Sequence, residues 1–314
     1  MKLLSELQLN SSHMEQLKQA FPKLEIITHP HADSWTVQDL KDIDFILGYP
    51  RPDIVRNAPN LKYLQLTSSG FELYSKDFYP FLVASATGAY GQPVSEYMLT
   101  SLLAFYHNLH LYRDNQRNRI WKNAGPVTTI QEQKILIIGT GNIGSHFAKL
   151  LKTFGAAVYG VAHTKCIFPD VFDKVYPACE LDMILPTVNV AALCIPGSAE
   201  NHHLFNLNRL KLLHHGSLLI NVGRGDIVDT KALCQVLDSG HLSGAILDVT
   251  DPEPLPSEHP LWDYPNVIIT PHDAGGFQYM TPALIQAIIS ITCENLRRYS
   301  EHKPLINQIQ TKKA

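Results

Sequence analysis

Three side chains with complementary chemistry follow short apolar runs in the second half of the chain. Arg224, Glu253 and His272 stand in the segments NVGRG, DVTDPEP and TPHDAGG, and each segment contains or directly follows the end of an apolar run. We expect these runs to be strands of one parallel sheet, because the carboxyl ends of such strands face the ligand crevice in an open α/β fold. The sequence therefore predicts an arginine, a glutamate and a histidine at neighbouring strand ends.

These are the residue types that hydride transfer to a 2-keto acid requires. An arginine presents a planar fork of donors that can bind a carboxylate and polarise a carbonyl. The carbonyl oxygen gains negative charge as the hydride arrives, and a histidine can supply the proton that neutralises it. A glutamate bonded to the imidazole would fix its tautomer. We expect Arg224, Glu253 and His272 to be catalytic as a set, although each alone could be an ordinary surface residue.

A glycine-rich segment earlier in the chain has the pattern of a dinucleotide-binding loop. The pattern GxGxxG follows the apolar run Lys134–Ile138 and opens an expected helix over Asn142–Thr153. Glycines permit a tight turn and a close approach of the backbone to a pyrophosphate, and the helix N-terminus supplies amide hydrogens. The motif alone is weak, but the order strand, loop and helix is the context that it requires. The expected cofactor-binding residues in this loop are Gly139, Thr140, Gly141, Asn142, Ile143 and Gly144.

The end of the next expected strand indicates which dinucleotide binds. In NAD-dependent enzymes an acidic side chain about 20 residues beyond the loop accepts a hydrogen bond from the ribose 2′-hydroxyl. No Asp or Glu occurs between Ser145 and Pro169. A small residue followed by polar and basic ones would instead accept a 2′-phosphate. The residues expected at this position are Ala162, His163, Thr164 and Lys165. The sequence thus favours NADP, with loosely held NAD as the alternative.

Apolar runs that alternate with helical patterns predict an α/β fold. Because the dinucleotide loop lies so far from the N-terminus, roughly the first hundred residues should form a domain of their own, with a ligand cleft between the two domains. We place a substrate-binding domain at residues 1–98 plus 282–314 and a dinucleotide-binding domain at residues 99–281. The second should be a doubly wound parallel (Rossmann) domain, and the first a smaller flavodoxin-like α/β domain.

Local patterns locate the individual elements. Capping-box spacing predicts a helix from Ser12 and a second short helix near Thr36. A long helical pattern starts near Pro93 and turns polar by Arg113–Arg119, and a last helix is expected over Thr281–Tyr299. The strands expected in the first domain are Leu24–Thr28, Ile43–Leu47 and Tyr63–Leu66. Those expected in the second are Lys134–Ile138, Ala157–Val161, Val190–Ile195, Ser217–Val222, Gly244–Val249 and Val267–Thr270.

Composition and charge argue against several classes of protein. The 314 residues are 45% hydrophobic and 18% charged with a formal net charge of −3, so no nucleic-acid partner is expected. The five cysteines have no CxxC spacing, which argues against a disulfide framework or a zinc site. No signal peptide and no run of about 18 apolar residues is found, so we expect a soluble, cytoplasmic protein without a metal or a membrane partner.

Taken together, these segments resemble the D-isomer-specific 2-hydroxyacid dehydrogenases, most specifically from Lys134 to Gly276. The resemblance implies that Arg224 binds and orients the substrate, that His272 is the acid/base and that Glu253 is its partner. It also implies an (R)-2-hydroxy acid product, an inter-domain helix that starts at the segment VSEY, and a homodimer formed through the nucleotide domain and that helix.

The same resemblance assigns further binding residues. Asp248 looks like the aspartate that positions the nicotinamide amide, and Val222 joins the expected cofactor-binding set. Ser69 and Gly70 belong to a loop similar to one whose backbone amides hold the substrate carboxylate. The loop expected to pack on the cofactor contains Cys194, Ile195 and Pro196.

Two departures from the family pattern matter. Ala162 stands where NAD-using members usually have an aspartate, which supports NADP. Asp273 follows the histidine where an apolar residue is common. Its carboxylate would favour a charged imidazole if it pointed inward.

Two other functions remain open on the sequence. A dinucleotide-sensing corepressor, or another non-catalytic binding protein of the same fold, could retain these residues, because fold does not imply function; turnover would distinguish it. Another Rossmann enzyme, such as a methyltransferase, would not need the Arg/Glu/His set, and titration with a nicotinamide cofactor would separate that case. The substrate stays open among glyoxylate, hydroxypyruvate, pyruvate and bulkier aromatic or branched keto acids.

Overall fold

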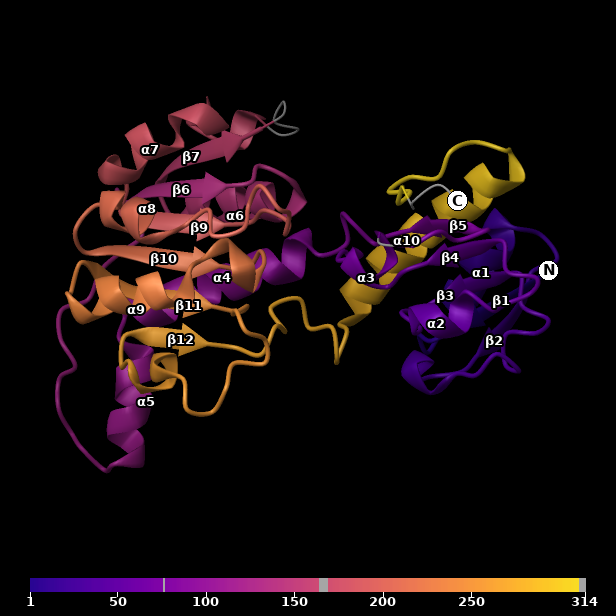
Figure 1. The fold of residues 1–314 in the computed structure, drawn as a ribbon, viewed down its shortest axis with the longest axis horizontal. Coiled ribbons are helices and arrows are strands. Elements are labelled where there is room, and N and C mark those ends of the chain that lie inside the picture. The colour runs from indigo at the N-terminus through magenta and orange to yellow at the C-terminus, as the bar shows by residue number, and fades with distance from the viewer. Residues whose placement is uncertain (76, 164–168, 311–314) are drawn as a thin grey trace. The chain divides into compact units, whose positions relative to one another are not determined.

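The computed structural model describes residues 1–75, 77–163 and 169–310 and divides the chain into two compact units (Figure 1). Unit 1 comprises Met1–Tyr90 and Tyr279–Ala314, and unit 2 comprises Gly91–Gln278. Both divisions come earlier in the chain than the boundaries expected from the sequence, 98/99 and 281/282. Helix α4 (Gly91–Tyr106) therefore lies wholly in unit 2.

Unit 1 is built on a five-stranded parallel sheet in the order β2-β1-β3-β4-β5. This is the flavodoxin-like order, as predicted. Its helices α1 (Ser11–Ala20) and α10 (Pro282–Ser300) pack together, and the side chains of Gln16 and Gln286 bond to each other at 2.8 Å. The strands are β1 (Lys2–Ser5), β2 (Glu25–Thr28), β3 (Phe45–Leu47), β4 (Tyr63–Gln65) and β5 (Leu82–Ala84). The two short helices are α2 (Pro52–Val55) and α3 (Glu72–Ser75).

Two local expectations for unit 1 were wrong. Helix α1 is capped by Asn10, whose side-chain oxygen accepts the N–H of His13 at 2.9 Å, so Ser12 is not the cap. The segment near Thr36 forms a hydrogen-bonded turn rather than a helix, because the Asp39 carboxylate accepts both the N–H and the hydroxyl of Thr36, at 2.8 and 2.7 Å. Asp and Thr side chains commonly compete with helices in this way.

Unit 2 is built on a seven-stranded parallel sheet in the order β12-β11-β10-β9-β6-β7-β8. The strand order reverses between β6 and β9, which is the switch point of a doubly wound sheet, so the Rossmann prediction is confirmed. The strands are β6 (Lys134–Ile138), β7 (Ala157–Ala162), β8 (Lys174–Pro177), β9 (Val190–Leu193), β10 (Ser217–Asn221), β11 (Leu242–Leu247) and β12 (Val267–Ile269).

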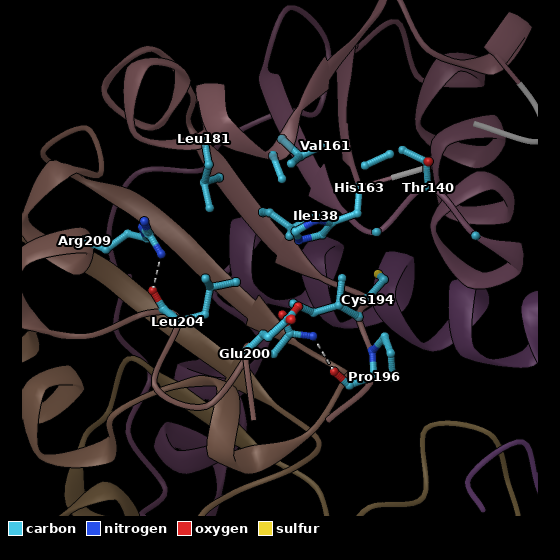
Figure 2. Close-up of a pocket in the computed structure, with 16 residues that line it drawn as sticks. Ile138, Thr140, Val161, His163, Leu181, Cys194, Pro196, Glu200, Leu204 and Arg209 are labelled. Atoms are coloured by element: carbon cyan, nitrogen blue, oxygen red, sulfur yellow. Dashed lines mark hydrogen bonds between the residues drawn. The ribbon is translucent and has the colours of Figure 1, made fainter. Parts of the chain in front are cut away.

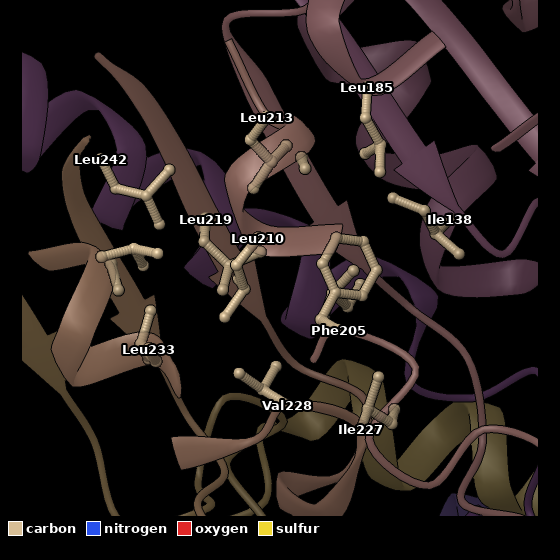
Figure 3. Packing of buried hydrophobic residues seen from close by; sticks show 14 of the residues in the cluster. Ile138, Leu185, Phe205, Leu210, Leu213, Leu219, Ile227, Val228, Leu233 and Leu242 are labelled. Atoms are coloured by element: carbon tan, nitrogen blue, oxygen red, sulfur yellow. The ribbon is translucent and has the colours of Figure 1, made fainter. Parts of the chain in front are cut away.

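The two faces of this sheet carry different helices. Ile138 and its neighbours on one face join a buried cluster with α7 (Leu181–Ile184), α8 (Leu207–Leu212) and α9 (Thr230–Asp238), and Figure 3 shows Phe205 near the centre of this cluster. Since successive strand residues point to opposite faces, Ile137 meets α6 (Asn142–Thr153) instead. Burial of this apolar cluster stabilises the sheet and so fixes the strand ends that carry the site.

The long helical pattern after Pro93 is two helices rather than one. α4 ends at Tyr106, Asn108 adopts a left-handed conformation with φ 57°, and α5 (Leu109–Arg117) follows. Asparagine tolerates this conformation better than most residues. In the described part of the chain, no helix combines the length and the apolar character needed to cross a bilayer.

Candidate functional site

A cavity of about 450 Å³ lies beside the glycine-rich loop of unit 2 (Figure 2). It is bounded by the carboxyl ends of β6, β7 and β9, where a doubly wound sheet binds its nucleotide. The predicted cofactor-binding residues that line it are Gly139, Thr140, Gly141, Ala162, His163, Cys194, Ile195 and Pro196. Two further predicted residues, Thr164 and Lys165, lie outside the described residues.

The glycines of this loop are required by close packing. Gly139 has φ +103°, and a Cβ placed on it would stand 2.6 Å from the carbonyl oxygen of Cys194. A Cβ on Gly144 would stand 2.0 Å from the carbonyl oxygen of Gly139. Gly141 caps α6, whose first turn contains Asn142 and Ile143. The loop therefore brings the start of α6 against β6, as phosphate binding at a helix N-terminus demands.

The cavity is apolar over much of its wall. Cys194 contributes a neutral side chain, because desolvation raises the pKa of its thiol to about 12. Leu181, Leu204 and Val161 line the same space. Such a surface suits an adenine ring, with a small number of polar groups to fix its orientation.

Sequence reasoning missed three polar residues of the cavity: Glu200, Asn201 and Arg209. Arg209 donates to both carboxylate oxygens of Asp182, at 2.6 and 3.2 Å, and to the carbonyl of Leu204. These bonds hold its guanidinium in place as part of the cavity wall. In the view of Figure 2, Thr140 and His163 lie at one end of the cavity and Arg209 at the other. No spacing rule could have found these residues, since they enter from the loop after β9 and from α8.

The loop after β10 is shaped by Asn221, which is buried. Its side chain accepts the N–H of Gly223 at 3.1 Å and donates to the carbonyl of Arg224 at 2.9 Å. The N–H of Val222, also buried, donates to the carbonyl of Leu193 at 3.2 Å. A Cβ on Gly225 would stand 1.9 Å from the carbonyl oxygen of Thr250. The Arg224 loop is therefore locked to the loop after β11, which carries Glu253.

The loops after β11 and β12 meet at the predicted acid/base pair. The Nδ1 of His272 lies 2.5 Å from Oε1 of Glu253, and both side chains are about half exposed. Because the glutamate accepts the Nδ1 hydrogen, Nε2 is the ring nitrogen left to exchange a proton with a ligand. The structure thus brings together two of the three residues expected to be catalytic, and locks the loop of the third to the same region.

Asp248 is buried and faces the loop of His272. Its carboxylate accepts the hydroxyl of Thr270 at 2.6 Å and the N–H groups of Asp273 and Ala274, each at 3.0 Å. The role expected for it in holding the nicotinamide amide stays a prediction. One oxygen of the Asp273 carboxylate is buried and makes no hydrogen bond within the described residues.

Ser69 and Gly70 lie in unit 1, between β4 and α3. The neighbouring Thr67 carbonyl accepts the hydroxyl of Tyr90 at 2.7 Å, and the Ser68 hydroxyl donates to the carbonyl of Gly70 at 2.6 Å. Within the described part of the chain, the N–H groups of Ser69 and Gly70 donate to no other residue. Amides of this kind are available to an anion.

The dinucleotide domain matches a known family. The model for the D-isomer specific 2-hydroxyacid dehydrogenase NAD binding domain matches residues 99–274. The chain belongs to this family. It is therefore an NAD(P)-dependent 2-hydroxyacid dehydrogenase. Among the described residues, no group of three or more His, Cys, Asp or Glu side chains is placed to hold a metal ion.

Individual relatives agree with the family. The glyoxylate reductase of Thermofilum pendens is 30% identical over 243 residues, which cover 71% of this chain and 68% of that protein. The structure of a family protein from Aeromonas salmonicida has a TM-score of 0.82 to this dehydrogenase, with 31% identity and 98% of both chains covered. A D-isomer specific 2-hydroxyacid dehydrogenase from Xanthobacter autotrophicus, solved with NADPH and MES, has a TM-score of 0.77, 25% identity and 98% coverage of both chains.

Proposed function

We propose that this dehydrogenase reduces a small 2-keto acid, of the size of glyoxylate, to the (R)-2-hydroxy acid with NADPH. The observation that carries the proposal is the 2.5 Å contact between His272 Nδ1 and Glu253 Oε1 at the strand ends of the dinucleotide domain. A glyoxylate reductase is among the relatives that support the substrate class.

Each polar group has a distinct part in the proposed reaction. NADPH, when bound in the cavity beside the glycine-rich loop, supplies the hydride. Nε2 of His272 gives the carbonyl oxygen its proton, and Glu253 holds the imidazole through Nδ1. Arg224 binds the substrate carboxylate and polarises the carbonyl. Ser69 and Gly70 bind the carboxylate through their backbone amides.

A panel of 2-keto acids, assayed with NADPH and with NADH, tests this function. We expect the highest kcat/KM for a small keto acid and an (R) product in chiral analysis. A predominantly (S) product would contradict the proposed mechanism. Binding of NADPH with no turnover of any keto acid would instead favour a dinucleotide-sensing corepressor.

The cofactor preference leads to a specific prediction about Ala162. No carboxylate follows β7 within the described residues up to His163, so we expect a higher kcat/KM with NADPH than with NADH. Ala162→Asp should weaken NADPH binding and strengthen NADH binding, because the new carboxylate would face the 2′-phosphate. A charged phosphate contact contributes about 1.5–3 kcal/mol, which is about one to two decades in preference. The measurement is kcat/KM with both cofactors.

Glu200 provides the control for this experiment, because it brings a carboxylate into the same cavity from the loop after β9. If Glu200 already binds the ribose hydroxyls, the unmodified enzyme will prefer NADH and Glu200→Gln will reduce that preference. Such a result would overturn the NADP proposal and leave the dehydrogenase function intact. Unchanged cofactor preference in Glu200→Gln, with an NADPH-preferring parent, would support it.

We also propose a homodimer in the cytoplasm, formed through α5 and the segment after it. Trp121 is fully exposed, and Ile120, Leu109 and Val127 are also open to solvent at 49%, 56% and 61%. Several exposed apolar side chains in one segment are typical of a protein interface. Sedimentation velocity that showed a monomer would contradict the dimer.

The cytoplasmic location is proposed from the cysteines. Their odd count without CxxC spacing supports a reducing compartment.

A further inference from the structure

The side chains of Tyr97, Thr270 and Asp248 form a chain of hydrogen bonds from helix α4 to the loop of His272. The hydroxyl of Tyr97 lies 2.7 Å from Oγ1 of Thr270, and this Oγ1 lies 2.6 Å from Oδ1 of Asp248. The reaction proposed above assigns no part to Tyr97 or Thr270. Tyr97 and Thr270 are 173 residues apart in the sequence, so only the fold brings them together.

The direction of these hydrogen bonds follows from a count of hydrogens. Asp248 accepts the N–H groups of Asp273 and Ala274, and it accepts the hydroxyl of Thr270 as well. A threonine hydroxyl has one hydrogen, and Thr270 gives it to Asp248. Tyr97 must therefore donate to Thr270. Burial raises the pKa of the Tyr97 phenol, which keeps it in the donating form.

Asp248 holds the loop of His272 on two sides. Its carboxylate binds the loop after His272, through the N–H groups of Asp273 and Ala274, and its carbonyl accepts the N–H of His272 itself at 2.7 Å. His272 has φ +54°, a left-handed conformation that few residues other than glycine adopt. Such a conformation persists only where surrounding contacts hold it.

The contact between His272 and Glu253 does not fix the loop on its own. Both side chains are about half exposed, at 46% and 40%, so water and salt weaken the interaction. Asp248, in contrast, is 3% exposed, and a buried carboxylate keeps its geometry because each lost donor is costly.

We propose that Tyr97 and Thr270 are positioning residues. They orient the Asp248 carboxylate and thereby hold the His272 imidazole in the orientation that proton transfer requires. The proposal rests on the function of His272 given above. Tyr97 and Thr270 touch neither the substrate nor the transferred proton. They act through Asp248, so their loss should change the rate of the chemical step and leave the binding of the 2-keto acid nearly unchanged.

The test uses two variants that each remove one hydroxyl, Tyr97→Phe and Thr270→Val, in the full-length enzyme. We expect kcat to fall about tenfold or more in each, since a displacement of about 1 Å in a reacting group can cost up to about a hundredfold. KM for the keto acid should stay within about twofold. Thr270→Ser keeps the hydroxyl and should restore most of kcat.

The double variant tests whether the two hydroxyls act as one line. If they do, Tyr97→Phe with Thr270→Val should lose about as much kcat as the worse single variant, not the product of both losses. Tyr264→Phe is the matched control, because the Tyr264 hydroxyl donates to Asp238 away from this loop, at 2.6 Å. It should retain the parent kcat.

The outcomes separate this proposal from the proposed function. If His272→Ala loses turnover while Tyr97→Phe and Thr270→Val keep the parent kcat, the positioning role is wrong and the acid/base role stands. If His272→Ala keeps its turnover, the proposed function itself fails. Multiplicative losses in the double variant would also overturn the proposal. Should Thr270→Val fail to fold, Tyr97→Phe alone, with Tyr264→Phe beside it, still decides.

Discussion

Replacing His272 with alanine is expected to lower kcat for keto acid reduction by about two to four orders of magnitude, the usual contribution of a general acid/base. With Nδ1 held by Glu253 at 2.5 Å, Nε2 is the proposed proton donor, and alanine supplies none. KM should change much less, because Arg224, the residue proposed to bind the substrate carboxylate, is unaltered. Steady-state kinetics in the direction of reduction, with NADPH saturating, measures both constants.

His272→Asn is the control that separates chemistry from loop structure. Residue 272 has φ +54°, and an alanine there could strain the loop. Asparagine tolerates this conformation better, yet it cannot act as an acid near neutral pH. We expect both variants to lose about two to four decades of kcat, because neither side chain can supply the proton. If His272→Asn recovered near-parent turnover, the loss in His272→Ala would be structural and the role of His272 as acid/base would be wrong.

The sequence predicted best where a local signal marks both ends of an element. Strand β6 was predicted with its bounds, because its apolar run and the glycines after it mark both ends. Strand β8 (Lys174–Pro177) was missed, since it is an edge strand whose end residues are exposed and which has little apolar periodicity. Strands β1 and β5 of unit 1 were missed as well, although most of their residues are buried, because each is only three or four residues long. The break at Asn108 was missed too, because a single left-handed residue leaves the helical pattern on both sides intact.

The residues of the candidate site also differ in how well the sequence predicts them. Glu253 and His272 could be expected together, because the parallel strands β11 and β12 are neighbours, and the loops that carry these two residues start at the same edge of the sheet. Glu200 and Arg209 could not, since nothing in the sequence says that the loop after β9 folds back over the cavity. The chain of hydrogen bonds from Tyr97 to Asp248 could not be predicted either, because it depends on how α4 packs against the sheet.

Gly225→Ala is expected to lower kcat/KM by about a hundredfold, through displacement of two loops at once. A Cβ at this position would lie 1.9 Å from the carbonyl oxygen of Thr250, 2.1 Å from its carbon and 2.7 Å from the nitrogen of Asp251. All three are backbone atoms that cannot rotate away, so the loop of Arg224 and the loop of Glu253 must separate. Overpacking of this kind costs about 1–3 kcal/mol of stability. Kinetics and a thermal melt measure the two effects.

Gly240→Ala shows whether lost stability alone explains the kinetic effect. Gly240 has φ +67°, so an alanine there is strained, but nothing stands within 4 Å of the added Cβ. It precedes β11 and therefore lies at the amino-terminal ends of the strands, opposite the carboxyl ends that carry the site. Both variants should lower Tm, and only Gly225→Ala should lower kcat/KM. Equal kinetic losses would mean that activity follows global stability. Parent kinetics in Gly225→Ala would show that the loops of Arg224 and Glu253 can move apart without harm, and that the close approach of Gly225 to Thr250 does not position the catalytic groups.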